Sequence, residues 1–291
     1  MNPDIFSGTL AAHSRLWKTA ESRMEATRFL RFIIRGAQFT AALESVIVIW
    51  KRLCSGQEEA GRAFAAWLDA VKTGGPEQAA HAERWAQLHN PLRVDMASLF
   101  IFGKILLDKW TLLLSRVLDA RAARGLKFRS FTRFTETLPT VDLTDKSPWP
   151  AFRDLIGSDV PQVTRVWTFL RDEFIAHGGN DLYPTLWYGS PPTQVHLRWE
   201  AQDLSDDERR ILVTLRDSLV GVIPGMEAAR EEHDILALLL QERYRICDTG
   251  QLDEVERVLR SLGTRSPDLN ETTEHLASLL ERSLAYLEAN V

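Results

Sequence analysis

The sequence from Val94 to Leu118 reads V-D-M-A-S-L-F-I-F-G-K-I-L-L-D-K-W-T-L-L-L-S-R-V-L and is the most apolar stretch of the chain. It contains five charged residues, and a charge near the middle of a membrane span costs roughly 2.5–3.5 kcal/mol. We therefore interpret it as the central helix of a protein core rather than as a membrane span. Asn90 and Pro91 are typical of a helix start, and the helix is expected to run to about Ala123.

A helix that is apolar on every side must be surrounded by other helices. Its polar positions Asp95, Lys104 and Asp108 then need partners if they are buried. Lys104 and Asp108 are one turn apart and are expected to form an ion pair. Helix-period patterns dominate elsewhere, and the one alternating segment is T-Q-V-H-L-R-W-E at 193–200. These patterns predict an all-α fold, a helical bundle with additional C-terminal helices.

Charge is unevenly distributed along the 291 residues, whose net charge is −5. Residues 1–150 carry 21 Lys and Arg against 15 Asp and Glu, whereas residues 201–291 carry 10 against 19. We predict a helical domain at 1–200 and an acidic helical region at 201–291. The acidic region opens with a capping box from Ser205 to Glu208. Its last helix carries one leucine stripe, expected to be a core or an oligomer contact: Leu276, Leu279, Leu280, Leu284 and Leu287.

Several classes of protein are disfavoured by what the sequence lacks. The two cysteines, Cys54 and Cys247, are far apart and belong to no metal or redox spacing, which favours a reduced, cytoplasmic protein. The first residues, M-N-P-D-I-F-S-G, do not resemble a signal peptide. No nucleotide-binding loop or metalloprotease motif occurs, and the seven histidines are scattered. We therefore expect no metal site, no cofactor and no membrane partner.

A second stretch, S-D-V-P-Q-V-T-R-V-W-T-F-L-R-D-E-F-I-A-H-G-G at 158–179, places titratable residues on an amphipathic helix. With successive residues 100° apart and Val163 at zero, His177 lies at about −40°, Arg171 at about +80° and Asp172 at about 180°. His177 therefore continues the apolar face, Arg171 borders it, and Asp172 points away. Histidine can exchange a proton near neutral pH, and the arginine fork fits a phosphate.

The segment from Arg121 to Phe134 is basic and aromatic and contains no acidic residue. Such a composition is typical of a single-stranded nucleic-acid surface, with cations for phosphates and rings for stacking. The alternative is that the phenylalanines pack inward while the charges are solvated, and this alternative is favoured for the segment taken alone. The candidate RNA-binding residues are Arg121, Arg124, Lys127, Arg129 and Arg133.

The motif R-D-E-F-I-A-H at 171–177, an R-x(5)-H pattern near the end of an apolar helix in an all-α chain, resembles the HEPN superfamily. The upstream helix D-M-A-S-L-F-I-F-G-K-I-L-L-D-K-W at 95–110 adds to this resemblance, which covers about residues 90–190. It implies a HEPN-type bundle within residues 1–200. It also implies a homodimer in which two Arg/His pairs face each other. Many members are metal-independent endoribonucleases of toxin, anti-phage or RNA-processing systems.

In that scheme His177 is the general acid or base, Arg171 holds the scissile phosphate, and Asp172 is a third catalytic position. We therefore expect a protein that acts on RNA, with its acidic C-terminal helices available to a protein partner. One alternative is a non-catalytic RNA-binding or protein-interaction module in which Arg171 and His177 are structural. Another is an antitoxin-like protein whose acidic region mimics nucleic acid.

Overall fold

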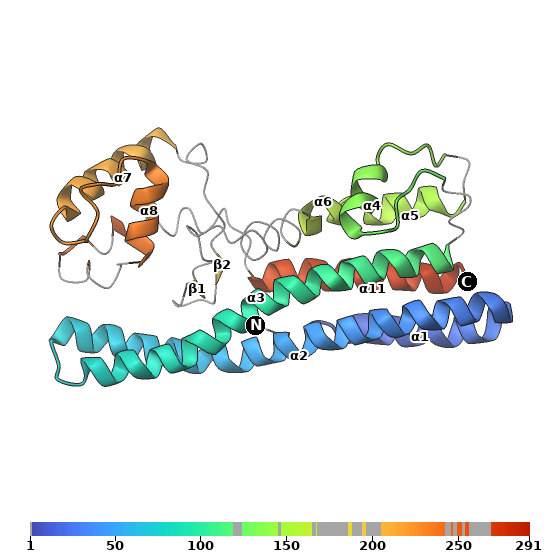
Figure 1. Cartoon of the computed structure of the whole chain (residues 1–291), viewed down its shortest axis with the longest axis horizontal. Coiled ribbons are helices and arrows are strands. Elements are labelled where there is room, and N and C mark those ends of the chain that lie inside the picture. The colour runs from blue at the N-terminus through green and yellow to red at the C-terminus, as the bar shows by residue number, and fades with distance from the viewer. Residues whose placement is uncertain are drawn as a thin grey trace. The chain divides into compact units, whose positions relative to one another are not determined.

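The protein is all-α, as its patterns predicted (Figure 1). A computed structural model describes residues 2–118, 124–144, 147–164, 167, 186–187, 194–195, 205–241, 246, 249–251, 254–255 and 269–291. Its strands are two residues long each: β1 (Leu186–Trp187) pairs antiparallel with β2 (Gln194–Val195). The second of these strands lies in the alternating segment at 193–200.

The chain forms two compact units that do not follow the predicted boundary at residue 200. One unit comprises Met1–Ser55, Val94–His177 and Asn270–Val291, and the other comprises Gly56–Arg93 and Gly178–Leu269. The C-terminal helix therefore belongs to the first unit, because its leucine stripe is part of that unit's core. The two units are described separately below.

The first unit is built on four long helices: α1 (Ser7–Arg23), part of α2 (Ala26–Thr73), part of α3 (Gln78–Val117) and α11 (Leu269–Ala289). Polar contacts join them. Thr9 Oγ1 of α1 donates to the carbonyl oxygen of Ala277 in α11 at 3.1 Å. The Trp110 indole N–H of α3 donates to Ser283 Oγ of α11 at 2.8 Å. Arg28 of α2 donates to the carbonyl oxygen of Val117, at the end of α3.

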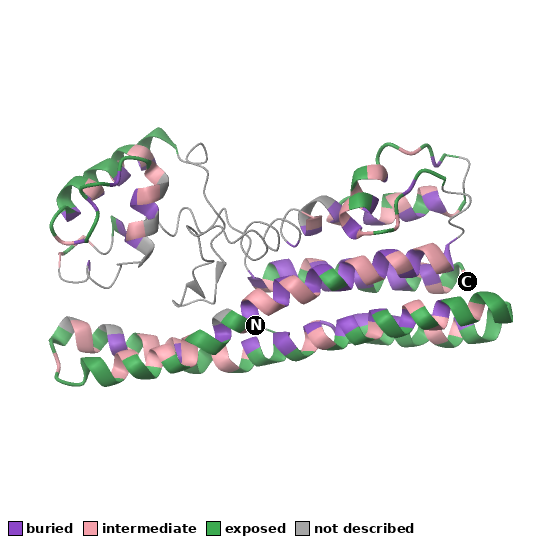
Figure 2. Ribbon diagram, viewed as in Figure 1, coloured by how far each residue is buried: buried purple, intermediate pink, exposed green. Residues whose placement is uncertain are grey.

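Figure 2 marks the buried positions of the four helices, and most of the residues at these positions are apolar. The leucine stripe of α11 is fully buried, so of its two predicted roles, a core face or an oligomer contact, the structure shows the core face. The stretch at 94–118 is also buried along most of its length, as predicted. Residues that are fully buried include Phe39, Trp50, Leu99, Trp110, Leu113, Leu280 and Leu284.

One helix boundary differs from the sequence-based expectation, and one glycine lies inside a helix without ending it. Helix α1 ends at Arg23, and α2 runs through Gly36. This glycine gives room to a tryptophan, because a Cβ there would lie 2.6 Å from Cζ3 of Trp17. A helix start was expected at Asn90 and Pro91, but both lie inside α3. An internal proline weakens a helix, and the residue that follows it, Leu92, is buried at 5% exposed.

Three short helices follow α3: α4 (Phe131–Thr137), α5 (Trp149–Ile156) and α6 (Asp159–Val163). Apolar residues of α4 and α5 face the long helices, and Phe131, Phe134 and Phe152 are fully buried. Asp159 at the start of α6 forms an ion pair with Arg282 of α11. The short helices are therefore fixed to the long ones by both apolar and ionic contacts.

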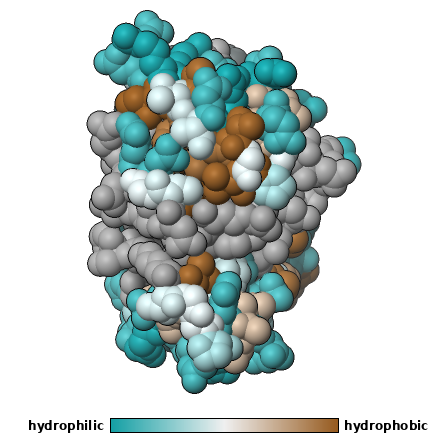
Figure 3. Space-filling view, turned by 90° about the vertical axis from the view of Figure 1, so that its left-hand side faces the viewer, coloured by the Kyte–Doolittle hydropathy of each residue, from teal (hydrophilic) through white to brown (hydrophobic). Residues whose placement is uncertain are grey.

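The second unit contains α7 (Asp206–Leu219) and α8 (Glu232–Gln241). The predicted capping box is present: Ser205 Oγ accepts from the Glu208 N–H, and the Glu208 carboxylate accepts from the Ser205 N–H at 2.8 Å. A small apolar core joins the two helices and includes Leu212, Leu215 and Met226. The upper part of Figure 3, where this pair of helices lies, shows some hydrophobic residues among hydrophilic ones.

The same unit contains the last part of α2, from Gly56, and the first part of α3, up to Arg93. These two parts contact each other through aromatic rings. Trp67 and Trp85 are stacked with ring centroids 5.0 Å apart and an interplanar angle of 2°. Phe64 contacts both indoles.

One helical segment in the described part of the chain, Ala26–Val71, is long and apolar enough to cross a membrane by length and composition. This is weak evidence, because the core helix of a soluble protein passes the same test. Of its apolar window, 39% is buried inside the structure, and the buried residues include Phe32, Phe39 and Trp50.

Candidate functional site

The candidate site that the structure describes is the basic segment, residues 124–133, which joins α3 to α4. Its four cations, Arg124, Lys127, Arg129 and Arg133, are all exposed. Arg121, the fifth candidate, lies outside the described residues. The described cations are therefore displayed on one short stretch of surface, with no acidic residue among them.

The phenylalanines of this region point into the core instead of into solvent. Phe131 and Phe134 are fully buried, with ring centroids 5.9 Å from that of Trp110. Phe128 is half-buried and contacts Phe134 at 5.7 Å and Trp149 at 5.5 Å. The inward-packing alternative thus describes these rings, and Phe131 and Phe134 are not available for stacking on bases.

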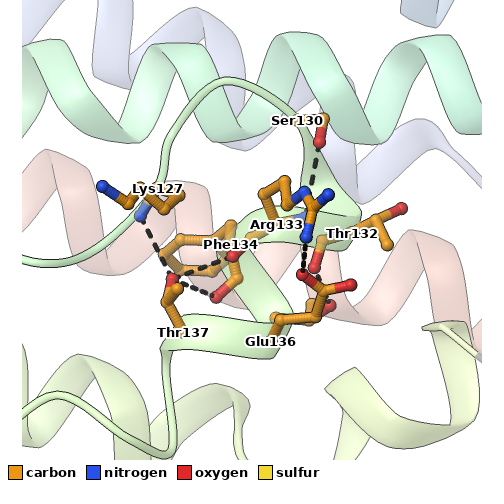
Figure 4. A network of polar contacts seen from close by, with 8 residues as sticks. Lys127, Ser130, Thr132, Arg133, Phe134, Glu136 and Thr137 are labelled. Carbon is orange, nitrogen blue, oxygen red and sulfur yellow. Dashed lines mark hydrogen bonds and ion pairs between the residues drawn. The ribbon is translucent and has the colours of Figure 1, made fainter.

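Hydrogen bonds within the segment fix its backbone (Figure 4). Thr137 Oγ1 accepts from the Lys127 N–H at 3.1 Å and donates to the Arg133 carbonyl oxygen at 2.8 Å. Ser130 caps α4, since its Oγ accepts from the Arg133 N–H. Both ends of the turn that carries Lys127 and Arg129 are therefore hydrogen-bonded to α4.

The segment is joined to α3 by a partly buried carboxylate. Asp108 Oδ1 accepts from the Phe131 N–H at 2.7 Å and from Lys104 Nζ at 2.7 Å. The Lys104 side chain is 8% exposed and that of Asp108 is 32% exposed. The predicted ion pair is therefore confirmed, and it has the additional role of holding the start of α4.

The four cations differ in whether their charge is paired. Arg133 Nη1 donates to Glu136 Oε2 at 2.8 Å, an exposed ion pair. No ion pair involving Arg124, Lys127 or Arg129 occurs among the described residues. Three cations are thus free to contact an external anion without first leaving an internal partner.

The aromatic residues beneath the segment also contact α11. The ring of Phe152 lies 5.5 Å from that of Tyr286, whose hydroxyl donates to the Pro148 carbonyl oxygen at 2.6 Å. Burial raises the pKa of Tyr286 above its ordinary value. A tyrosine phenol is protonated at neutral pH even at its ordinary pKa, so the hydroxyl is able to donate this hydrogen bond.

The predicted catalytic residues Arg171, Asp172 and His177 lie outside the described residues. The start of their segment is described in part, and two apolar residues there are buried: Val163 is 1% exposed and Trp167 is 0% exposed. The Trp167 ring packs 5.3 Å from that of Phe100 on α3. It also covers Gly103, where a Cβ would lie 2.2 Å from its Cζ3 atom.

Other titratable groups lie away from the basic segment. His13 is buried between Trp17 and Phe39, and desolvation lowers its pKa. Desolvation also raises the pKa of the half-buried Cys54 thiol. Within the described residues, no group of three or more His, Cys, Asp or Glu side chains is placed to hold a metal ion.

Sequence reasoning missed two features of this region. It paired Asp108 with Lys104 but did not foresee that Asp108 also accepts from the Phe131 N–H, a contact across 23 residues. It also did not foresee that Glu136 would neutralise Arg133; the i,i+3 spacing on a helix could have indicated this.

No protein-family model, curated protein or solved structure matches this chain.

Proposed function

We propose that this protein binds RNA through the basic segment. The observation that carries the proposal is the set of three exposed, unpaired cations, Arg124, Lys127 and Arg129, on a backbone fixed by hydrogen bonds. Lysine and arginine side chains that neutralise phosphates supply most of the affinity of sequence-independent nucleic-acid binding. Because two of the phenylalanines are buried, binding rests on charge rather than on ring stacking.

We further propose that Arg171 and His177 cleave the bound RNA as a metal-independent endoribonuclease, of the toxin or anti-phage type implied by the HEPN resemblance. His177 would take the proton of the 2′-hydroxyl or protonate the leaving oxygen, and Arg171 would hold the scissile phosphate. Asp172 would be the third position. The proposal includes a homodimer, a cytoplasmic location and a protein partner for the acidic C-terminal helices.

Binding is tested with a short single-stranded RNA carrying 2′-O-methyl groups, which blocks attack by the 2′-hydroxyl. The double substitution Lys127→Gln/Arg129→Gln removes two phosphate contacts. Since affinity varies with salt to the power of about −0.7 per contact, it is expected to weaken binding by about 25-fold at 0.1 M salt. The matched control is Lys18→Gln/Arg23→Gln on α1, which removes two exposed cations that form no described ion pair.

Equal affinities in the two double variants would refute binding at the basic segment. A decrease confined to Lys127→Gln/Arg129→Gln would support it. Circular dichroism and thermal unfolding of each variant check that the difference in affinity is not a difference in folding.

Cleavage is tested by incubating the purified protein with unmodified RNA in EDTA, beside Arg171→Ala and His177→Ala. The proposed mechanism predicts cleavage by the wild type and its loss in both variants, with RNA binding by His177→Ala retained. Equal activity in all three proteins would exclude the catalytic assignment.

A non-catalytic RNA-binding module is the second candidate, and the position of the cations favours it. The backbone N–H groups of Lys127 and Phe131, on either side of Arg129, donate to Thr137 of α4 and to Asp108 of α3, so the position of this turn rests on contacts that do not involve residues 171–177. This candidate predicts RNA binding without cleavage. It also predicts that His177→Ala lowers stability by about 1–3 kcal/mol, as loss of a buried hydrogen-bonded group does.

A further inference from the structure

Helix α2 has two apolar faces within the first unit. With successive residues 100° apart, its most deeply buried large apolar residues lie within about 40° of Phe39. This buried face consists of Phe32, Phe39, Leu43, Val46, Trp50 and Leu53, each at most 3% exposed. The opposite face, which we name the outer stripe, consists of Leu30, Ile34, Ala37, Ala41, Glu44 and Val48. Every residue of the outer stripe is exposed.

The outer stripe differs from the surface of an ordinary bundle helix. A helix that covers a core normally carries polar residues on its solvent side. Here Leu30 is 63% exposed, Ile34 58% and Val48 54%, and they rank among the most exposed large apolar side chains in the described part of the chain. Half-buried Ile33 and Ile47 widen the stripe on one side.

The spacing of the outer stripe is that of a coiled-coil seam. Its residues follow one another at intervals of four, three, four, three and four. This is the alternation of the a and d positions of a heptad, the positions that face a partner helix. Near its middle stand Ala37 and Ala41, whose small side chains allow two helix backbones to approach closely. The shape that fits this seam is another helix.

Charge indicates that the other helix is a second copy of α2 in antiparallel orientation. Residues 26–35 carry Arg28, Arg31 and Arg35 and no acid, whereas the stripe's own charge is Glu44. A parallel pair in register would place two Glu44 side chains against each other. In an antiparallel pair centred between Ala37 and Ala41, Glu44 of one copy lies opposite Ile34 of the other copy. Arg31 of that other copy is three residues from its Ile34, so Glu44 lies within one helical turn of an arginine.

The antiparallel alignment also matches the apolar residues. Leu30 then lies opposite Val48 of the other copy, and Ala37 lies opposite its Ala41. Seventeen residues separate Leu30 from Val48, so the seam is about 27 Å long. At a width of about 10 Å it covers about 270 Å² per copy, well below the about 800 Å² of a stable interface. The expected association is therefore weak and concentration-dependent.

We propose that two copies of this chain associate through the outer stripes of their α2 helices, antiparallel and in this register. The proposal rests on the sequence and exposure of α2 alone. It does not depend on RNA binding, on cleavage, or on the position of residues 171–177.

Site-directed disulfide formation tests both the surface and the orientation. Cys54 and Cys247 are first changed to Ser. In this background, Leu30→Cys and Val48→Cys are prepared as two separate proteins. Each protein is oxidised by itself, and a mixture of the two is oxidised in parallel. The antiparallel pair predicts a cross-linked dimer in the mixture only, because like positions are about 27 Å apart. Cross-linking of each variant alone would overturn the orientation, and no cross-linking in any sample would overturn the surface.

Sedimentation of the cysteine-containing wild type gives an independent readout. A concentration-dependent dimer is expected, with Ile34→Glu shifting the protein to monomer at all concentrations. Val94→Glu changes an equally exposed apolar residue, at 65%, outside the stripe and should leave the dimer intact. A monomer at every concentration, combined with binding to lipid vesicles that Ile34→Glu abolishes, would show that the stripe contacts a membrane and would overturn the proposal.

Discussion

The substitution Asp108→Asn tests whether the ion pair beneath the basic segment stabilises the fold. It removes the negative charge but keeps an oxygen that can accept from the Phe131 N–H, now 2.7 Å from Asp108 Oδ1. The Lys104 ammonium, on a side chain 8% exposed, would be left without its counter-charge. The experiment therefore isolates the charge from the hydrogen bond.

The expected loss follows from the burial of the two partners. Breaking a buried ion pair costs about 3–5 kcal/mol, because the remaining charge stays in the interior. Asp108 is 32% exposed, so solvent screens part of the interaction and the expected loss is about 3 kcal/mol. Lys104→Met/Asp108→Asn removes both charges and is expected to lie within about 1 kcal/mol of the wild type.

Urea unfolding followed by tryptophan fluorescence measures these differences, and about 3 kcal/mol lowers the midpoint by about 1 M. Glu58→Gln is the matched control. Its ion pair with Arg62 also spans four residues of a helix but is 79% and 67% exposed, so the expected loss is about 0.5 kcal/mol or less. The reasoning is refuted if Lys104→Met adds to the loss caused by Asp108→Asn instead of reversing it.

Three further predictions concern the fold. Desolvation lowers the pKa of His13, so below pH 6.5 the unfolded chain binds a proton that the folded protein does not. The free energy of unfolding should fall by up to about 1.4 kcal/mol per pH unit below that pH. His13→Phe should remove this slope; curves of unfolding free energy against pH that are parallel for the wild type and His13→Phe would contradict the prediction. Gly103→Ala should destabilise by about 1–3 kcal/mol, because its Cβ would overlap the buried Trp167 ring, whereas Gly61→Ala has open space and should stabilise. Ser205→Ala should cost about 1 kcal/mol by removing the cap of α7, and an unchanged unfolding curve would argue against that cap.

Local patterns predicted the helices, and their physical basis explains why. A leucine stripe at the helix period can only be satisfied by burial, and the stripe of α11 is fully buried. The capping box at Ser205 and Glu208 and the ion pair of Lys104 with Asp108 depend on residues three or four apart. Each of these interactions is decided within one turn of helix, so the sequence contains all the information it needs.

Boundaries and long-range contacts could not be predicted in the same way. A proline and a glycine are read as helix breakers, yet Pro91 lies inside α3 and Gly36 inside α2, because packing with neighbouring helices outweighs local propensity. The assignment of α11 to the first unit depends on contacts such as that of Ser283 with Trp110, 173 residues away. No local pattern encodes such a contact.

The candidate site was predicted in part. Composition indicated the basic segment, and its four described cations are exposed. Composition could not indicate which rings are buried or which charge is paired, since both depend on α3 and on the fold of α4. The catalytic assignment of Arg171, Asp172 and His177 remains a prediction from their resemblance to the HEPN superfamily.

The central claim, that the basic segment binds RNA phosphates, is tested most directly by the salt dependence of affinity. Binding of the 2′-O-methyl RNA is measured between 50 and 400 mM salt for the wild type, for Lys127→Gln/Arg129→Gln and for Lys18→Gln/Arg23→Gln. Two lost contacts should reduce the slope of log affinity against log salt by about 1.4 in the first variant, and by nothing in the second. Equal slopes in all three proteins would contradict the claim.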